Sequence, residues 1–304
     1  MYFLRRILFI PPLLLLITFL AFVLVRIAPG GPFDRERTPA SPEVERRLKA
    51  RYHLDEPLWK QYLRYVGKVV QGDLGPSLKQ RNHTVNEIVK QGLPISLMLG
   101  GCAFMFAMGI GIPLGLFRAA RANSAFGHAA LLAAALAVAV PALVIGPLLA
   151  MIFAVKLGWF PVALLESPAH FVLPTVTLGL YFAGRVARLM DEGLRSISSS
   201  NFLLTARAKG LSDLSILFRH ALPLAILPVV SYSGPMLADL LTGSFVVENI
   251  FQIPGIGVFM VNSSLSRDYT LTVGLVLIYA TLLLFLNLLV DIAYGVLDPR
   301  VRLD

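Results

Sequence analysis

LTARAKGLSDLSILFRHALP, residues Leu204–Pro223, is a basic segment between two strongly apolar stretches of the chain. It contains a single glycine, Gly210, and a serine two residues later at position 212. Glycine tolerates the left-handed backbone that ends a helix, and serine is a preferred residue for capping a new one. We therefore predict a short helix, a turn at Gly210, and a second short helix whose continuation Pro223 limits.

The rest of the chain is strongly apolar. Its 304 residues are 56% hydrophobic and 15% charged, with a mean hydropathy of +0.72. One soluble core cannot hide that much apolar surface, so the composition predicts an integral membrane protein. The net charge of +9 comes from Lys and Arg residues beside apolar stretches, without the aromatic and basic surface of nucleic-acid-binding proteins. The single cysteine, Cys102, excludes a disulfide framework, and the five histidines lack metal-ligand spacing.

Six apolar stretches are each near the ~20 residues that a helix needs to cross the hydrocarbon core, although the fourth is short. Because lipid offers the backbone no hydrogen-bond partner, we predict that all six are helices. They cover residues 7–25, 94–117, 129–155, 171–184, 224–247 and 271–290. Internal prolines predict kinks packed against neighbouring helices, at Pro113, Pro141, Pro147, Pro174, Pro228 and Pro235. The predicted fold class is an all-α polytopic membrane protein with about six transmembrane helices.

The apolar stretches divide the chain into three parts. We predict a first transmembrane helix with an extracytoplasmic helical segment over residues 1–93, a five-helix core over 94–293, and a cytoplasmic tail over 294–304. The core holds the opening segment in a cytoplasmic loop at about 198–223. The first apolar stretch exceeds the ~7–15 residues of a signal peptide, so we expect it to be retained.

Basic residues predict the orientation. With the N-terminus in the cytoplasm, twelve Lys and Arg residues near the ends of the spans lie inside, against Lys156 and Arg267 in the two short outer loops. Both termini are therefore expected in the cytoplasm. The long outer segment contains a helix start at 41–45 and helical spacing over 58–70. It fits a small helical cap on the outer face and a helix lying on the membrane surface equally well.

The second short helix of the opening segment has an apolar side. Leu214, Leu217 and Phe218 cluster there, whereas Asp213 and Arg219 lie elsewhere. This surface suits a groove on another protein. A connector that rests on lipid headgroups fits the same pattern.

Several motifs resemble a known family. Thr205-Ala206, Gly210 and Leu222-Pro223 are similar to the EAA loop of ABC importer permeases. Motifs along nearly the whole chain resemble the peptide-transport branch of that family, and most of all the B-type permeases of oligopeptide systems. They are VRIAPGGPF (25–33), YHLDEP (52–57), GDLGPS (72–77), TARAKGL (205–211), TGSFVVENIFQIPGIG (242–257), RDY (267–269) and DPRVR (298–302). Leu204 departs from the EAA pattern, which has glutamate there, and Asp191 stands where the branch often carries a basic residue.

The resemblance implies the type I permease fold of ABC importers in a bacterial inner membrane. It implies a subunit that forms half of a translocation pathway for oligopeptides and is not itself an enzyme. The implied partners are a second homologous permease, two ATPase subunits that bind ATP and Mg, and an extracytoplasmic peptide-binding protein. No GxxxxGK[ST] phosphate loop occurs in this sequence, in agreement with separate ATPases. The residues implied to contact the ATPase are Thr205, Ala206, Arg207, Lys209, Gly210, Leu214, Leu217, Phe218, Leu222 and Pro223.

Three further features have two interpretations each. Asp239 lies well inside a span, so it either lines the pathway and attracts cationic peptide groups, or forms a structural hydrogen bond to the partner permease. Pro254, Gly255 and Gly257 predict a tight turn that either shapes an extracytoplasmic mouth or ends a re-entrant segment. The GIGIPLG run at 109–115 resembles a dinucleotide fingerprint, but close helix packing through small residues explains it better.

Other functions remain open at this point. Sibling permeases with the same motifs carry dipeptides, nickel chelates, cationic peptides or sugars. A stand-alone ion-coupled transporter would be expected to have more intramembrane ionisable residues and an internal repeat. A receptor or assembly platform would leave the kinked spans and the glycine-broken loop without a purpose.

Overall fold

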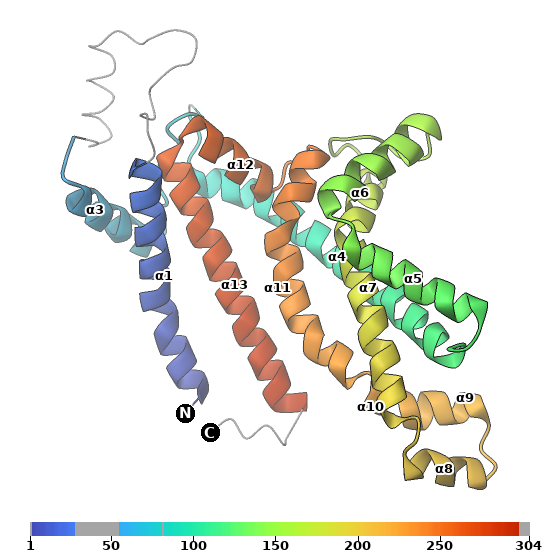
Figure 1. The fold of residues 1–304 in the computed structure, drawn as a ribbon. Helices are drawn as coiled ribbons and strands as arrows, with labels where there is room; N and C mark the ends of the chain where they lie inside the picture. Colours follow the sequence, from blue (N-terminus) through green and yellow to red (C-terminus); the bar gives the residue numbers. More distant parts are fainter. Residues whose placement is uncertain (1, 28–54, 81, 298–304) are drawn as a thin grey trace. The chain divides into compact units, whose positions relative to one another are not determined.

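The computed structural model describes residues 2–27, 55–80 and 82–297, and these residues form helices joined by short connections (Figure 1). Within these ranges the one extended pairing is an isolated antiparallel bridge between Pro76 and Thr84. The all-α class predicted from the sequence is therefore confirmed. The predicted helix start at 41–45, the part of the VRIAPGGPF motif beyond residue 27, and most of the tail at 294–304 lie outside the described residues.

Among the described residues, three helices are long and apolar enough to cross a membrane. Candidate spans lie at Arg6–Ile27 in α1 (Tyr2–Ile27), at Val85–Ala120, which is all of α4, and at Tyr269–Leu289 in α13 (Tyr269–Leu297). Two bent helix pairs raise the count to five by length and composition, if each pair is one span. These five regions overlap five of the six predicted apolar stretches.

The predicted third span is not one continuous helix. It is split into α5 (Ala125–Ala139) and the segment Ala142–Lys156, which are bent by 107° at the break. Pro141 follows the break, and Val140 has the extended φ of −93° and ψ of 122° that a residue before proline favours. The second segment contains α6 (Ala142–Leu149) and the π-helix η1 (Ala150–Lys156). Pro141 thus ends a helix rather than kinking it.

The predicted fourth stretch, 171–184, opens a longer helix. The 3-10 turn η2 (Pro168–Phe171) leads into α7 (Val172–Ile197), whose 26 residues are long enough to cross a bilayer. Its second half is polar, and α7 is not among the helices that combine sufficient length with apolar composition. The short stretch therefore gains its length from a charged C-terminal flank.

The chain forms two compact units, which are described separately. Of the described residues, the first unit holds those in 2–95 and 254–288, and the second holds 96–253 and 289–297. The first unit contains α1, α3 (Leu58–Val70), the beginning of α4, α12 (Ile256–Ser266) and most of α13. Its core consists of Leu74, Val85, Ile88, Val89, Ile256, Leu271, Leu275 and Leu277. These side chains pack the start of α4 against α12 and α13.

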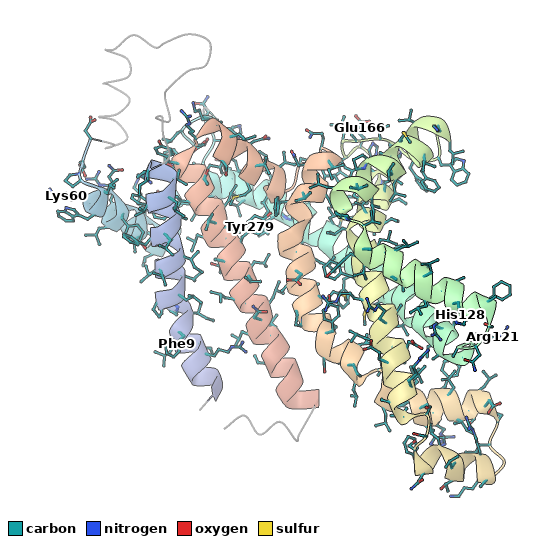
Figure 2. All side chains as sticks on the ribbon, viewed as in Figure 1. Phe9, Lys60, Arg121, His128, Glu166 and Tyr279 are labelled. Atoms are coloured by element: carbon teal, nitrogen blue, oxygen red, sulfur yellow. The ribbon has the colours of Figure 1, made fainter. Side chains whose placement is uncertain are left out.

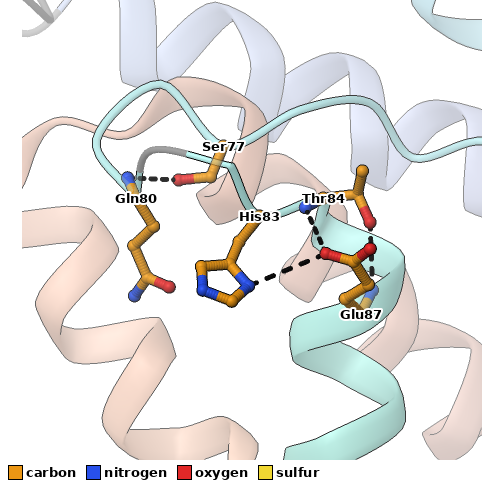
Figure 3. Close-up of polar contacts among 5 residues, drawn as sticks. All are labelled: Ser77, Gln80, His83, Thr84 and Glu87. Atoms are coloured by element: carbon orange, nitrogen blue, oxygen red, sulfur yellow. Dashed lines mark hydrogen bonds and ion pairs between the residues drawn. The ribbon is translucent and has the colours of Figure 1, made fainter.

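The start of α4 is fixed by its own side chains. The Thr84 hydroxyl accepts a hydrogen bond from the Glu87 N–H at 3.2 Å, and the Glu87 carboxylate accepts one from the Thr84 N–H at 3.0 Å (Figure 3). This reciprocal capping box satisfies two backbone donors that a helix start leaves unpaired. His83 lies 3.7 Å from the same carboxylate and is half exposed. The capping box, rather than that exposed contact, defines where α4 begins.

A buried carboxylate holds the loop before α4. Asp268 accepts hydrogen bonds from the Ser77 hydroxyl and from the N–H groups of Leu78 and Lys79, the last two at 3.1 Å. It also accepts the Leu271 N–H at 3.1 Å, within the first turn of α13. The GDLGPS and RDY motifs, which lie about 190 residues apart, are thereby joined at one acid.

The second unit is built around α7, which packs against α5, α6, α10 (Leu222–Ala225) and α11 (Leu227–Ile250). The rest of α4 also packs on α7, through Gly111 and Gly115. A Cβ added at these glycines would lie 2.7 Å from the Ala183 carbonyl oxygen and 2.5 Å from that of Ala187. The prediction that the GIGIPLG run serves close helix packing is confirmed.

Candidate functional site

The predicted turn at Gly210 is present. Helix α8 (Asn201–Ala208) ends with the Gly210 N–H bonded to the Arg207 carbonyl at 2.9 Å and the Leu211 N–H bonded to the Ala206 carbonyl at 3.3 Å. These two bonds form a Schellman motif, and Gly210 has the left-handed φ of +77° that the motif requires. An added Cβ at Gly210 would meet nothing within 4 Å. Backbone conformation, rather than space, therefore demands glycine here.

The second helical segment begins at Ser212, as predicted. The Ser212 hydroxyl accepts the Ser215 N–H at 3.4 Å and caps α9 (Asp213–Ile216). A π-turn, η3 (Leu217–Ala221), and α10 then continue the helical path to Ala225, where it bends by 50° before α11. The prediction that Pro223 limits this helix was wrong by two residues. Pro223 stands in the first turn of α10, where a missing N–H is tolerated.

The 198–223 loop has a small apolar core of its own. Leu203, Ala206, Ile216 and Ala221 are buried together, and Leu217 packs against them with two side chains from the end of α7, Leu194 and Ile197. Two of the predicted partner-facing residues, Ala206 and Leu217, therefore point inward. Leu217 was misplaced because a four-residue helix followed by a π-turn does not keep the 3.6-residue period on which its prediction relied. Ala206 lies in α8 and was assigned from the family resemblance, which does not show which way its side chain points.

Other predicted residues are exposed on this loop. Leu214 is 69% exposed and Phe218 is 57% exposed, and they lie four positions apart, so we call them the Leu214/Phe218 pair. Leu222 is partly buried, and the remaining predicted residues, Thr205, Arg207, Lys209, Gly210 and Pro223, are exposed.

The end of the 198–223 loop packs closely against α7. A Cβ added at Gly193 of α7 would lie 2.1 Å from the Ala225 carbonyl oxygen, so α7 and α10 are in backbone contact. Near the same end of α7, Asp191 is buried and accepts a hydrogen bond from Arg195 Nε at 3.0 Å. Asp191, which stands where the peptide-transport branch often carries a basic residue, thus forms an ion pair with Arg195 within α7. The Gly193 contact therefore places the end of the loop directly against the backbone of α7.

Asp239 belongs to a polar cluster on α7 and α11. It is exposed and interacts electrostatically with Arg185 and Tyr232. Arg185 donates to the Tyr181 hydroxyl at 3.2 Å, and its guanidinium carbon lies 4.9 Å from the centre of the Tyr232 ring. The sequence predicted Asp239 but not these companions. Arg185 directly follows the fourth predicted stretch and was counted only as a flanking charge.

A second acid in α11 was missed. Glu248 is fully buried, and Ser244 donates a hydrogen bond to its Oε1 at 2.7 Å. Because Glu248 directly follows the predicted span at 224–247, its position alone did not indicate burial. Among the described residues, no group of three or more His, Cys, Asp or Glu side chains could hold a metal ion.

The predicted turn at 254–257 has a different geometry from the one expected. The left-handed residue is Gln252, with φ of 51°, whereas Gly255 is extended and precedes α12. Gly255 and Gly257 are buried, and Pro254 is exposed. A Cβ added at Gly92 would lie 3.0 Å from the Ile256 backbone nitrogen, so α4 and the start of α12 are in close contact. The small residues therefore serve packing in the first unit.

Comparison with known proteins gives consistent matches. A family model described as "Binding-protein-dependent transport system inner membrane component" matches residues 111–303. The chain is 40% identical over 295 residues to the "Oligopeptide transport system permease protein OppB" of Haemophilus influenzae, covering 96% of each chain. It is also 40% identical over 302 residues to the "Dipeptide transport system permease protein DppB" of Bacillus subtilis, covering 99% of this chain and 98% of that protein.

Solved structures share the fold. An inward-facing structure of the MetNI methionine ABC transporter has a TM-score of 0.60 at 16% identity, covering 69% of this chain and 96% of that chain. A structure titled as an amino acid ABC transporter with histidines has a TM-score of 0.53 at 20% identity, covering 69% and 94%. At these identities the likeness concerns the arrangement of helices alone.

Proposed function

This chain belongs to the family of binding-protein-dependent inner membrane transport components, as a permease subunit of an ABC importer, and we propose that oligopeptides are its substrate. The relative from Haemophilus influenzae carries the oligopeptide name in its title and matches nearly the full length. The motifs APGGPF and GDLGPS, which resemble the oligopeptide branch, support the same substrate.

The subunit works within a larger assembly. In this proposal it forms half of the translocation pathway beside a second homologous permease, with both termini in the cytoplasm. Two ATPase subunits bind ATP and Mg, and an extracytoplasmic peptide-binding protein delivers the substrate. The division at 1–93, 94–293 and 294–304 then separates the first helix with its outer segment, the permease core, and the tail. Pro254, the exposed residue of the 254–257 turn, stands at the outer mouth.

The single observation that carries the mechanism is the shape of the 198–223 loop. Its own core, formed by Leu203, Ala206, Ile216 and Ala221, lets it move as one body. The Leu214/Phe218 pair is left exposed, and we assign it to a cleft of the ATPase. When ATP closes the ATPases, the loop moves, and the close contact of Gly193 with α10 passes the motion to α7 and α11. The binding energy of ATP thereby changes which side of the membrane the pathway opens to.

Asp239 and Arg185 supply charges along the pathway in this proposal. Asp239 attracts cationic groups of passing peptides, and Arg185, held by Tyr181, attracts their carboxylates. Uptake of lysine-containing and neutral peptides by Asp239→Asn tests this role. We expect the uptake of lysine-containing peptides to fall and that of neutral peptides to stay unchanged. Uptake of both classes at the wild-type rate would contradict this role of Asp239.

Dipeptides are the second candidate substrate, because the relative from Bacillus subtilis named for them is as similar as the oligopeptide relative. Uptake of labelled peptides of two to six residues by cells that carry the complete importer separates the candidates. We expect peptides of four or five residues to compete with a labelled tetrapeptide. Uptake of labelled dipeptides without uptake of the labelled tetrapeptide would assign the dipeptide function instead.

The assembly itself is tested by intact-complex mass measurement after purification in mild detergent. We expect recovery with a second permease and two ATPases. Recovery of the chain alone, in a detergent that preserves a control importer, would contradict the assembly and reopen the stand-alone transporter.

A further inference from the structure

The first unit contains a cavity of about 410 Å³, within the usual range of ligand pockets. It is bounded by α1, α3, the loop after α3, and the beginning of α13. Three cationic side chains line it, those of Arg26, Arg64 and Lys68, and none of its described lining residues is acidic. Much of the remaining wall is apolar. The cavity therefore combines a positive side with an apolar side.

Arg26 is the best-fixed of the three cations. Its guanidinium carbon lies 3.4 Å from the centre of the Phe22 ring and 5.4 Å from that of Tyr269. Its hydrogen bonds go to neutral acceptors, the Gln61 amide oxygen at 3.2 Å and the Phe22 carbonyl at 3.3 Å. Within the part of the chain that the structure describes, no carboxylate pairs with Arg26. A half-buried guanidinium held this way presents its remaining N–H donors to an anion.

The neighbouring polar groups add donors and leave the site positive. Arg64 pairs with Glu56 at 3.0 Å, whereas Lys68 is exposed and forms no ion pair with another described residue. The Tyr65 hydroxyl is buried and has no hydrogen-bond partner among the described residues. Burial raises the pKa of Tyr65, so its hydroxyl stays protonated and can donate. Two cations without an ion-pair partner among the described residues, Arg26 and Lys68, thus line the same cavity as the Tyr65 side chain.

We propose that this cavity binds the phosphate of an anionic phospholipid headgroup. Arg and Lys are the residues that bind phosphate oxygens, Arg through paired N–H donors and Lys as a compact charge. A headgroup without an ammonium group suits a site with net positive charge. The apolar wall, which includes Phe22, Leu74 and Val273, then contacts the glycerol and the first methylene groups of the lipid.

The placement of the site favours a lipid over a peptide. Arg26 lies in the last turn of α1, at the end of a helix long and apolar enough to cross the membrane, which is the level of lipid phosphates. Helix α3 beside it exposes Trp59, Leu63 and Val70 at 60%, 61% and 82%. Their spacing puts them on one side of the helix, as in a helix that lies at the membrane surface. Of the two interpretations that the sequence left open for α3, this one fits the exposed stripe.

The test uses the complete importer and a short-chain phosphatidylglycerol, whose binding is measured by native mass spectrometry. We expect Arg26→Gln and Lys68→Gln each to weaken that binding about tenfold, because each removes a charge-assisted contact. Lys60→Gln is the matched control. Lys60, labelled on α3 in Figure 2, is exposed and does not line the cavity, so this variant should bind within about twofold of wild type.

Two further variants protect the test against misfolding at Arg26. Arg26→Lys keeps the charge and should recover most of the binding, and Tyr65→Phe removes the hydroxyl donor and should weaken it. Unchanged binding in both Lys68→Gln and Tyr65→Phe would overturn the proposal, whether or not Arg26→Gln assembles.

Competition identifies the ligand. Phosphatidylglycerol should bind more tightly than phosphatidylcholine, and inorganic phosphate at millimolar concentration should not displace it. Displacement by inorganic phosphate would make this a free-phosphate site, and displacement by a peptide with a free carboxylate would make it a peptide site. Either result would contradict lipid binding.

Discussion

The loop at residues 72–84 in the first unit and the 198–223 loop in the second are both short connections next to helices, but different contacts hold them. The 72–84 loop depends on Asp268, about 190 residues away, which binds Ser77, Leu78 and Lys79. The 198–223 loop depends on its own Schellman turn at Gly210 and its own apolar core. A loop fixed by a distant residue keeps its place in its unit, whereas a loop with its own core can move without losing its shape.

The largest expected difference between the two loops follows from replacing Asp268. Replacing it by alanine leaves the buried Leu271 N–H and the partly buried N–H groups of Leu78 and Lys79 without their acceptor. We expect Asp268→Ala to destabilise the first unit by about 3 kcal/mol, since each unsatisfied buried donor costs roughly 1–3 kcal/mol. Thermal unfolding of the purified complex measures this loss. Asp268→Asn retains one acceptor oxygen and should lose less.

The same Asp268→Ala variant should leave the 198–223 loop intact. Limited proteolysis provides the readout, with new cleavage at 72–84 and none at 198–223. Equal protease sensitivity of both loops would mean that their structures are not independent.

Substitution of Gly210 tests whether the 198–223 loop depends on its own turn. Its φ of +77° costs a residue with a side chain about 1–2 kcal/mol, and a β-branched residue more. We therefore expect Gly210→Val to open the turn and to reduce peptide uptake several-fold while the protein still inserts into the membrane. Gly210→Asn is the control, because asparagine tolerates this conformation. Wild-type uptake by Gly210→Val would show that the turn is dispensable.

Thr84 gives the smallest expected effect. Thr84→Ala removes one half of the capping box of α4 and should cost about 1 kcal/mol. The 72–84 loop should keep its shape, because Asp268 and Asn86 still bind it. A thermal shift comparable to that of Asp268→Ala would show that local capping, and not the distant acid, holds this loop.

Local features were predictable from the sequence. The turn at Gly210 and the cap at Ser212 follow from properties of single residues, and both are present. The small-residue packing of Gly111 and Gly115 likewise needs only a close helix neighbour. These predictions succeeded because the deciding interactions lie within a few residues or require no specific partner.

Features that depend on distant residues were not predictable. The pairing of Asp268 with Ser77 joins segments far apart in the sequence, and nothing near either residue indicates it. Pro141 was expected to kink a helix, but whether proline kinks or ends a helix depends on what packs around the break. Leu217 was assigned outward because the π-turn that begins there has no sequence signature that we recognised, and Ala206 because the core that buries it is formed by residues on both sides of Gly210.

The central claim is that the Leu214/Phe218 pair of the 198–223 loop binds the ATPase. The most direct measurement is the amount of ATPase that copurifies with a Leu214→Asp, Phe218→Asp double variant, compared with wild type and with a Leu214→Met, Phe218→Leu control. We expect at least tenfold less ATPase to copurify with the double aspartate variant, because it places two charges in an apolar contact. The control should copurify with as much ATPase as wild type. Undiminished copurification with a correctly inserted double aspartate variant would contradict the account.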